Sequence, residues 1–364
     1  MRMAANLPVC LINPSNETDD GLLNDDQMKV VAIVNVITSA LSILGSGSII
    51  LCTVFHRKIC FSEVYPIFQL SIADLLASLF FFSSTIMFLV GVANYPGSCG
   101  PCDYVTAVMT SFYISTLFLT LSYALEAFLR VRKRLYDGLT SSTREQQKKV
   151  VSYSFMHLIY AVAWMVPLTA GIILLVFTHW VTAKDTTSPL VNFSIVIPRE
   201  CSTCLPVFHY TQDDPCWCHV ENGKSWHLAY KLVFLIPLIA VFLSNIVLYV
   251  CITRAFKQVS MRRGLYTFHQ RQEESTVRRK AILYQCAFLF CWLPTLILGM
   301  LSFQTDFMMR KYFWLYLLQA LLGPLQGFLN CIIYGWKREQ FRRALSENSS
   351  LTSTNMPSYL SLTL

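Results

Sequence analysis

Long apolar stretches alternate with mostly short polar links along this chain. A helix needs about 20 predominantly apolar residues to cross the hydrocarbon core of a bilayer. On that criterion the pattern predicts seven membrane-spanning helices, at residues 29–55, 64–92, 103–129, 150–178, 228–253, 281–303 and 312–335. No stretch repeats another, so the sequence lacks the internal repeats that are typical of many transporters.

The spans divide the chain into four expected parts. These are an outer tail over 1–28, an all-α seven-transmembrane helix bundle over 29–335, a short helix over 336–346 and a disordered cytoplasmic tail over 347–364. Two links stand out by length or charge, an outer loop at 179–227 and an inner loop at 254–280. The short helix is expected to lie on the membrane, because charges occupy one of its faces and the other carries Trp336, Phe341 and Leu345.

The composition agrees with a membrane protein, since hydrophobic residues make up 54% of the chain and charged residues only 14%. Soluble domains carry roughly 25% charged residues. The net charge of +8 is unevenly distributed: the first tail and the links on its side, counted with Lys29 at the start of the first span, carry 7 Lys and Arg, against 21 on the other side. Cytoplasmic loops carry such an excess. We therefore expect the N-terminus outside, the C-terminus in the cytoplasm, and no nucleic-acid partner.

Two glycosylation sequons fall on the expected outer side, Asn16-Glu-Thr and Asn192-Phe-Ser. A third, at Asn348, falls in the cytoplasmic tail and is expected to stay unused. Because these sequons mark exposed sites in secretory proteins, Asn16 and Asn192 are predicted to carry glycans. The expected location is the plasma membrane.

Asp74 lies in the middle of the second predicted span. A carboxylate at membrane depth is costly unless it is paired or hydrated. One interpretation is a switch or Na⁺ site that faces Asn330 of the seventh span and Ser115 of the third. The other is a packing aspartate that bonds to its neighbours without an ion. The sequence leaves both interpretations open.

Two charged residues near the ends of spans also have two interpretations each. Glu126 precedes a basic run at the inner end of the third span, and it forms either a lock released on activation or an ordinary interfacial ion pair. Lys231 lies near the outer start of the fifth span. It is expected to extend its ammonium group to the interface, with ligand contact as the alternative.

Trp292 precedes Pro294 in the sixth predicted span. A proline removes a backbone hydrogen bond and clashes with the preceding turn, so the helix is expected to kink there. A bulky aromatic side chain beside a kink suits a hinge, whereas packing alone is the simpler explanation of the tryptophan. Bends are also expected in the fourth, fifth and seventh spans, at Pro167, Pro237 and Gly323-Pro324.

Seven of the 13 cysteines fall on or near the outer side: Cys10, Cys99, Cys102, Cys201, Cys204, Cys216 and Cys218. The last four, followed by His219, resemble a zinc ligand set, but these residues pass through an oxidising lumen, where disulfides form. The most useful disulfide ties the third span to the outer loop and pins that loop over the bundle mouth. We therefore predict that Cys102 pairs with Cys216 or Cys218. The odd count leaves one thiol unpaired or intermolecular.

Several motifs together resemble those of G-protein-coupled receptors. Cys102 lies 24 residues before Glu126, about where rhodopsin-like receptors place their third-span cysteine and acidic motif. Further matches in four other spans are Gly45-Ser46, Leu70-x-x-x-Asp74, Trp164 and Cys291-Trp-x-Pro294. Two motifs depart from that class, because Asp-Arg-Tyr reads Glu126-Ala127-Phe128 and Asn-Pro-x-x-Tyr reads Asn330-Cys-Ile-Ile-Tyr334.

The seventh span also resembles a second receptor class. Gln326-Gly-Phe, with Tyr334 eight residues after Gln326, is similar to the secretin-like seventh span. A mixture of both classes is typical of the cyclic-AMP-receptor-like group, and the run from Leu315 to Trp336 resembles one orphan family within it. The switch residues expected from these motifs are Asp74, Asn330, Tyr334, Trp292, Pro294 and Glu126.

These observations predict an orphan receptor that transmits an extracellular ligand signal to a heterotrimeric G protein by rearranging its helices. The basic inner links also suit contact with anionic membrane lipid. The alternative, based on Ala127 in the third-span triplet, is a non-signalling seven-helix protein that acts as a partner or in trafficking.

Other function classes lack the residues that they need. A transporter needs several charges at membrane depth, and only Asp74 is clearly placed there. An enzyme is not expected, because intramembrane hydrolases use paired carboxylates or several histidines and His157 alone supplies neither. No cofactor is expected either, since a retinal protein needs a lysine in the seventh span and 312–335 contains none.

Overall fold

The computed structural model describes residues 23–55, 64–91, 101–137, 145–185, 204–208, 223–262, 268–304 and 308–335. Several predictions fall outside these ranges, and the structure neither supports nor opposes them. They are the glycosylation sites Asn16 and Asn192, the cysteines Cys216 and Cys218, the short helix at 336–346 and the tail at 347–364.

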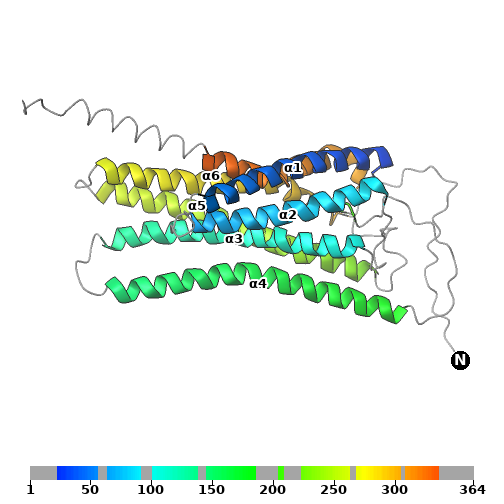
Figure 1. The fold of residues 1–364 in the computed structure, drawn as a ribbon, viewed down its shortest axis with the longest axis horizontal. Coiled ribbons are helices and arrows are strands. Elements are labelled where there is room, and N and C mark those ends of the chain that lie inside the picture. Colours follow the sequence, from blue (N-terminus) through cyan, green and yellow to red (C-terminus); the bar gives the residue numbers. More distant parts are fainter. Residues whose placement is uncertain are drawn as a thin grey trace, which may run out of the picture.

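Every regular element among the described residues is helical, and the long helices lie alongside one another (Figure 1). The elements are α1 (Asp25–Phe55), α2 (Tyr65–Val90), α3 (Pro101–Asp137), α4 (Glu145–Asp185), α5 (Gly223–Arg262), α6 (Phe268–Leu301), the 3₁₀ turn η2 (Met309–Tyr312) and α7 (Phe313–Leu322). A further helical segment, Gln326–Gly335, follows α7 after a short break.

Among the residues that the structure describes, six helices are long and apolar enough to cross a membrane, and the bent pair Met309–Leu322 with Gln326–Gly335 makes a seventh span. The two parts of that pair differ in direction by 45°. The bend falls at Gly323 and Pro324, as predicted, because proline cannot donate the hydrogen bond that continues a helix. The seven predicted spans are thus confirmed, and the fold is a seven-helix bundle of a multi-pass membrane protein.

The helices are longer than the predicted spans at the ends that carry charged residues. Helix α5 continues to Arg262 and α6 begins at Phe268, so most of the predicted inner loop is helical. Hydropathy detects only the part of a helix that lies in lipid, and it does not detect a polar extension into water. The helices α4, α5 and α6 also continue through Pro167, Pro237 and Pro294, and the kinks predicted there stay predictions.

Helix α3 is central, since it contacts α2, α4, α5 and α6, whereas α4 packs mainly on α3 at one edge of the bundle (Figure 1). The outer faces of α4 and α5 carry large exposed apolar side chains, among them Met165, Ile173 and Val247. Side chains of this kind face hydrocarbon in a membrane protein, where no hydrophobic effect drives them inward.

Helix α1 meets the seventh span so closely that no side chain fits at Gly45. A Cβ atom on Gly45 would lie 2.6 Å from the Cα atom of Phe328. On the facing segment, a Cβ atom on Gly327 would lie 2.2 Å from the Oγ of Ser46 and 3.3 Å from the Cβ of Asp74. Small residues of this kind let helix backbones approach in membranes. The contact places the seventh span directly beside α1 and α2.

Gly45→Ala is expected to lower the melting temperature of the purified protein, because the new methyl group meets backbone atoms that have no rotamer to change. Overpacking of a tight contact costs about 1–3 kcal/mol. Gly47→Ala is the matched control in the same helix, since a Cβ atom there meets nothing within 4 Å. Thermal unfolding in detergent measures both variants, and equal melting temperatures for the two would contradict this packing.

Candidate functional site

The buried carboxylate of Asp74 is the centre of a polar core within the bundle. Asp74 is 4% exposed. The Nδ2 of Asn330 donates a hydrogen bond to its Oδ2 at 2.8 Å, and the Nε2 of Gln326 donates to its Oδ1 at 3.3 Å. Residues four apart share one helical face, so Gln326 and Asn330 reach the same carboxylate from the segment after the Gly323–Pro324 bend.

Gln326 also connects this core to the sixth span. The indole Nε1 of Trp292 donates a hydrogen bond to the Oε1 of Gln326 at 2.5 Å. One amide side chain therefore accepts from α6 and donates to α2. The hydrogen-bonded residues Trp292, Gln326, Asp74 and Asn330 are called the polar chain, which joins α2 to the consecutive sixth and seventh spans.

The predicted neighbour Asn330 is confirmed, but Ser115 is not a partner of Asp74. The hydroxyl of Ser115 donates to the carbonyl of Ser111, one turn earlier on α3, at 3.0 Å. This bond satisfies the buried hydroxyl within its own helix. Gln326 was missed as a site residue. Its position, one turn before Asn330 on the same face, is the signal that identifies it. The amides supply each oxygen of Asp74 with a donor, and the Na⁺ interpretation stays a prediction.

Aromatic rings from α3 and α5 pack around Trp292. Its ring lies 5.4 Å from that of Tyr113 in an edge-to-face arrangement and 6.0 Å from that of Phe234. Tyr113 in turn meets Phe81 of α2 at 5.9 Å. Such pairs are worth about 0.5–1.5 kcal/mol each beyond their buried area, so the indole is held by packing as well as by its hydrogen bond.

The other expected switch residues are not joined to the polar chain by a side-chain hydrogen bond that the structure shows. Pro294 is buried in α6, two residues after Trp292. Tyr334 packs in a separate cluster with Tyr284 and Ile49. Tyr334 lies one helical turn beyond Asn330, so its side chain packs further along the seventh span than the residues that bond to Asp74.

Glu126 joins the C-terminal half of α3 to the N-terminal half of α4. Arg130, one turn further along α3, donates to Oε1 of Glu126 in a salt bridge, and the hydroxyl of Tyr160 donates to Oε2 at 2.5 Å. These partners fit the interpretation as an interfacial ion pair. A release of this pair on activation stays a prediction.

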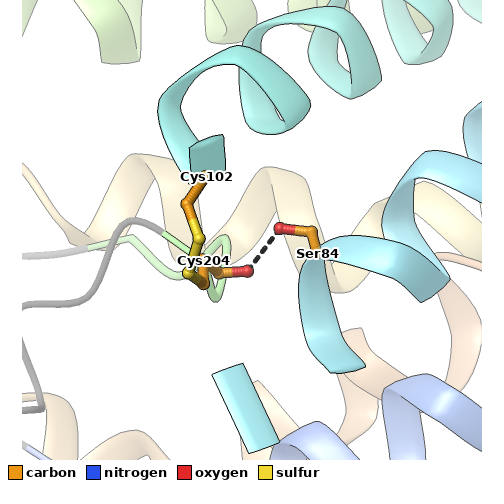
Figure 2. Close-up of a disulfide and its surroundings, with 3 residues drawn as sticks. All are labelled: Ser84, Cys102 and Cys204. Carbon is orange, nitrogen blue, oxygen red and sulfur yellow. Dashed lines mark hydrogen bonds between the residues drawn. A yellow bond between two sulfur atoms is a disulfide. The ribbon is translucent and has the colours of Figure 1, made fainter. Parts of the chain in front are cut away.

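The predicted disulfide of Cys102 is present, but its predicted partner was wrong. Cys102, at the start of α3, pairs with Cys204, not with Cys216 or Cys218. Figure 2 shows Cys204 beside α2, where the hydroxyl of Ser84 donates to its carbonyl oxygen at 2.5 Å. A disulfide at Cys204 also removes one sulfur from the zinc set considered above. Spacing along the chain failed here, because residues 204–208, which precede α5 by more than ten residues, lie beside the starts of α1 and α3.

Lys231 is buried within the bundle, and its expected position at the membrane interface stays a prediction. Lys231 is 5% exposed, and its Nζ lies 5.8 Å from the ring centroid of Phe303 beyond the end of α6. An ammonium group near an aromatic face is attracted by the ring quadrupole. The helical rotation of α5, which the sequence leaves undetermined, turns this side chain into the bundle.

Asn330→Asp is expected to lower the melting temperature, because two carboxyl groups then face each other where an amide donated before. An unsatisfied buried group costs about 1–3 kcal/mol. The exchange variant, with Asp74→Asn added, is expected to recover part of the loss, since it restores an amide–carboxylate pair. Ser115→Ala is the control and should change the melting temperature little. An exchange variant that melts no higher than Asn330→Asp would contradict the direct contact.

Comparison with known proteins agrees with this architecture. Cyclic AMP receptor-like protein A of Dictyostelium discoideum is 32% identical over 129 residues, which are 35% of this chain and 31% of that protein. Cyclic AMP receptor-like protein C of the same organism is 26% identical over 297 residues, 78% of this chain and 67% of that protein. Both names describe receptor-like proteins, not enzymes. A family model described as transmembrane protein 116 matches residues 28–361, which is most of the sequence, and the chain therefore belongs to the transmembrane protein 116 family.

Proposed function

We propose that this protein is a receptor of the G-protein-coupled type, which transmits an extracellular signal by shifting its helices between two states. The observation that carries the proposal is the polar chain. It joins α2, α6 and the seventh span through buried hydrogen bonds at the 45° bend of the seventh span. The likeness to proteins named as receptor-like supports the same conclusion.

The polar chain suits a two-state switch. Buried hydrogen bonds in a low-dielectric interior are stabilising when complete and costly when broken. A movement of α6 that separates Trp292 from Gln326 breaks a buried hydrogen bond. The moved helix therefore has to form another complete set of hydrogen bonds, which favours two discrete states. A ligand shifts the balance between them only by the difference in its affinity for each state. Asp74 and Asn330 form the hinge core in this mechanism, with Glu126 and Tyr334 nearer the inner end.

The partner on the inner side is, in this proposal, a heterotrimeric G protein. Helices α5 and α6 extend to Arg262 and from Phe268, well beyond the apolar segments that end at Ala255 and begin at Ile282. Such extensions provide a surface whose position changes when α6 moves. Their positive charge also suits the anionic surface of the inner leaflet.

A second function is favoured by one observation at the inner end of α3. Ala127 is 7% exposed and packs with Ile252 of α5, in the position where rhodopsin-like receptors have an arginine. The adjacent Glu126 is engaged by Arg130 and Tyr160. These contacts occupy the end of α3 at which a G protein would bind. They suit a seven-helix protein that acts as a partner or in trafficking without activating a G protein.

Nucleotide exchange on purified G proteins decides between the two functions. In lipid nanodiscs, the protein is expected to accelerate exchange on at least one G-protein family above empty nanodiscs. Trp292→Ala is expected to change that rate severalfold, because it removes the donor to Gln326, while Trp314→Ala on the exposed outer surface of α7 should not. If neither the protein nor an Ala127→Arg variant accelerates exchange on any family, the receptor function is refuted and the non-signalling function is favoured.

The proposed orientation places the N-terminus outside and the inner helix extensions in the cytoplasm. The disulfide end of the bundle is also the end at which α1 begins, since Cys102, Cys204 and Met28 belong to one buried cluster. Disulfides form in oxidising compartments, and the positive charge gathers at the opposite end. We place the protein in the plasma membrane, with glycans at Asn16 and Asn192.

Protease treatment of sealed microsomes tests this orientation. An N-terminal tag is expected to be protected inside the vesicle, and a C-terminal tag is expected to be digested. Mass spectrometry of the protected material without reductant should find a peptide that contains Cys102 linked to one that contains Cys204. Loss of the N-terminal tag with protection of the C-terminal tag would reverse the orientation.

A further inference from the structure

Residues 204–208, the part of the outer loop between α4 and α5 that the structure describes, lie at the mouth of the bundle where α1 and α3 begin. Cys204 is fully buried and Leu205 is 2% exposed. Leu205 belongs to an apolar cluster to which the other spans contribute Met28 and Val31 of α1, Phe88 of α2, Leu298 of α6, and Met309, Tyr316 and Ala320 near the seventh span. A loop segment that crossed over the surface would not bury an apolar side chain among four spans.

Three attachments fix this segment, which we call the mouth segment. The disulfide joins Cys204 to the start of α3. Ser84 of α2 donates to the carbonyl of Cys204, and the hydroxyl of Tyr316 on α7 donates to the carbonyl of Phe208. Buried backbone carbonyls need such donors. Two spans therefore supply side-chain donors at the two ends of a five-residue peptide.

The last residue of the mouth segment reaches the polar chain through one intervening ring. The ring of Phe208 lies 6.2 Å from that of Phe234 on α5, which lies 6.0 Å from that of Trp292. Trp292 donates to Gln326, which donates to Asp74. The path from the outer loop to the buried carboxylate is therefore continuous.

We propose that the mouth segment is a tethered ligand of this bundle, and that the outer mouth is a binding site for an aromatic peptide group. The site provides an aromatic ring for a side chain, from Phe234, which in turn packs on Trp292, and a hydroxyl donor for a peptide carbonyl, from Tyr316. The proposal rests on the proposed receptor function, whose ligand site it describes. Phe208 stabilises the state of Trp292 seen here.

Tethering explains why the site is filled by the chain itself. A group held on a short linker acts at an effective concentration of about millimolar. A free ligand must therefore be abundant, or bind more tightly than the mouth segment, to replace it. The mouth segment and a free aromatic peptide therefore compete for the same site.

The alkylation rate of Cys291 tests the proposal without any G protein. Cys291 is a free, fully buried cysteine next to Trp292, so its reaction with N-ethylmaleimide reports opening around the switch. Mass spectrometry of its peptide gives the rate. Phe208→Ala is expected to raise this rate about tenfold, because it removes a partly buried ring and its contact with Phe234. The matched control is Phe112→Ala on α3. This variant also removes an aromatic ring, but one that stacks on Phe80 at 5.6 Å and not on Phe234.

A free peptide then tests the ligand class. The peptide Ser-Leu-Pro-Val-Phe, which copies 204–208 without the reactive thiol, is expected at millimolar concentration to slow alkylation in Phe208→Ala. The same peptide with Ala in place of Phe should have no effect. Tyr316→Phe, which loses only a hydroxyl, is expected to raise the rate severalfold if Phe208→Ala does not fold.

The outcomes separate this proposal from the proposed function. Unchanged alkylation in folded Phe208→Ala and Tyr316→Phe, an equal rise in Phe112→Ala, or no effect of the phenylalanine peptide would each overturn the tethered ligand. If alkylation and peptide respond as expected while nucleotide exchange is absent, the mouth segment is the occupant of the site and the receptor function fails.

Discussion

The need to satisfy one buried carboxylate organises this bundle. Asp74 is buried in the middle of a membrane span, where an unpaired charge costs several kcal/mol. The seventh span supplies both amide donors, from Gln326 and Asn330. It does so from a helical segment that starts anew after the Gly323–Pro324 bend. The bend and the small residues at Gly45 and Gly327 together let that segment approach α1 and α2 closely enough for these bonds to form.

Different interactions hold the helices together at the two ends of the bundle. The outer end is filled by an apolar cluster, with the mouth segment held there by a disulfide and by donors from Ser84 and Tyr316. The inner end of α3 is held by an ion pair and a hydroxyl at Glu126. The polar chain lies between the two ends. In the proposed receptor, a signal that crosses the bundle passes through the polar chain, because its hydrogen bonds connect α6 and the seventh span to α2.

The membrane-embedded part of the fold follows from the sequence, because hydropathy and helix length have a simple physical cause in the thickness of the bilayer. The pairing of Asp74 with Asn330 was also predictable, since a buried charge requires a partner. Gln326 was overlooked as a second donor, although it lies one turn before Asn330. The extension of α5 to Arg262 was not predicted, because a polar helix in water has no hydropathy signal.

The sequence by itself determined the number of spans, the bend at Gly323–Pro324 and the presence of a polar core, since each depends on local composition or on a strong local energy. Only the tertiary structure decided the partner of Cys102 and the burial of Lys231. Several cysteines of one loop are chemically equivalent, and the one that pairs is the one that the folded chain brings within bonding distance. A lysine near a helix end is exposed or buried according to the rotation of that helix, which packing against the other spans sets.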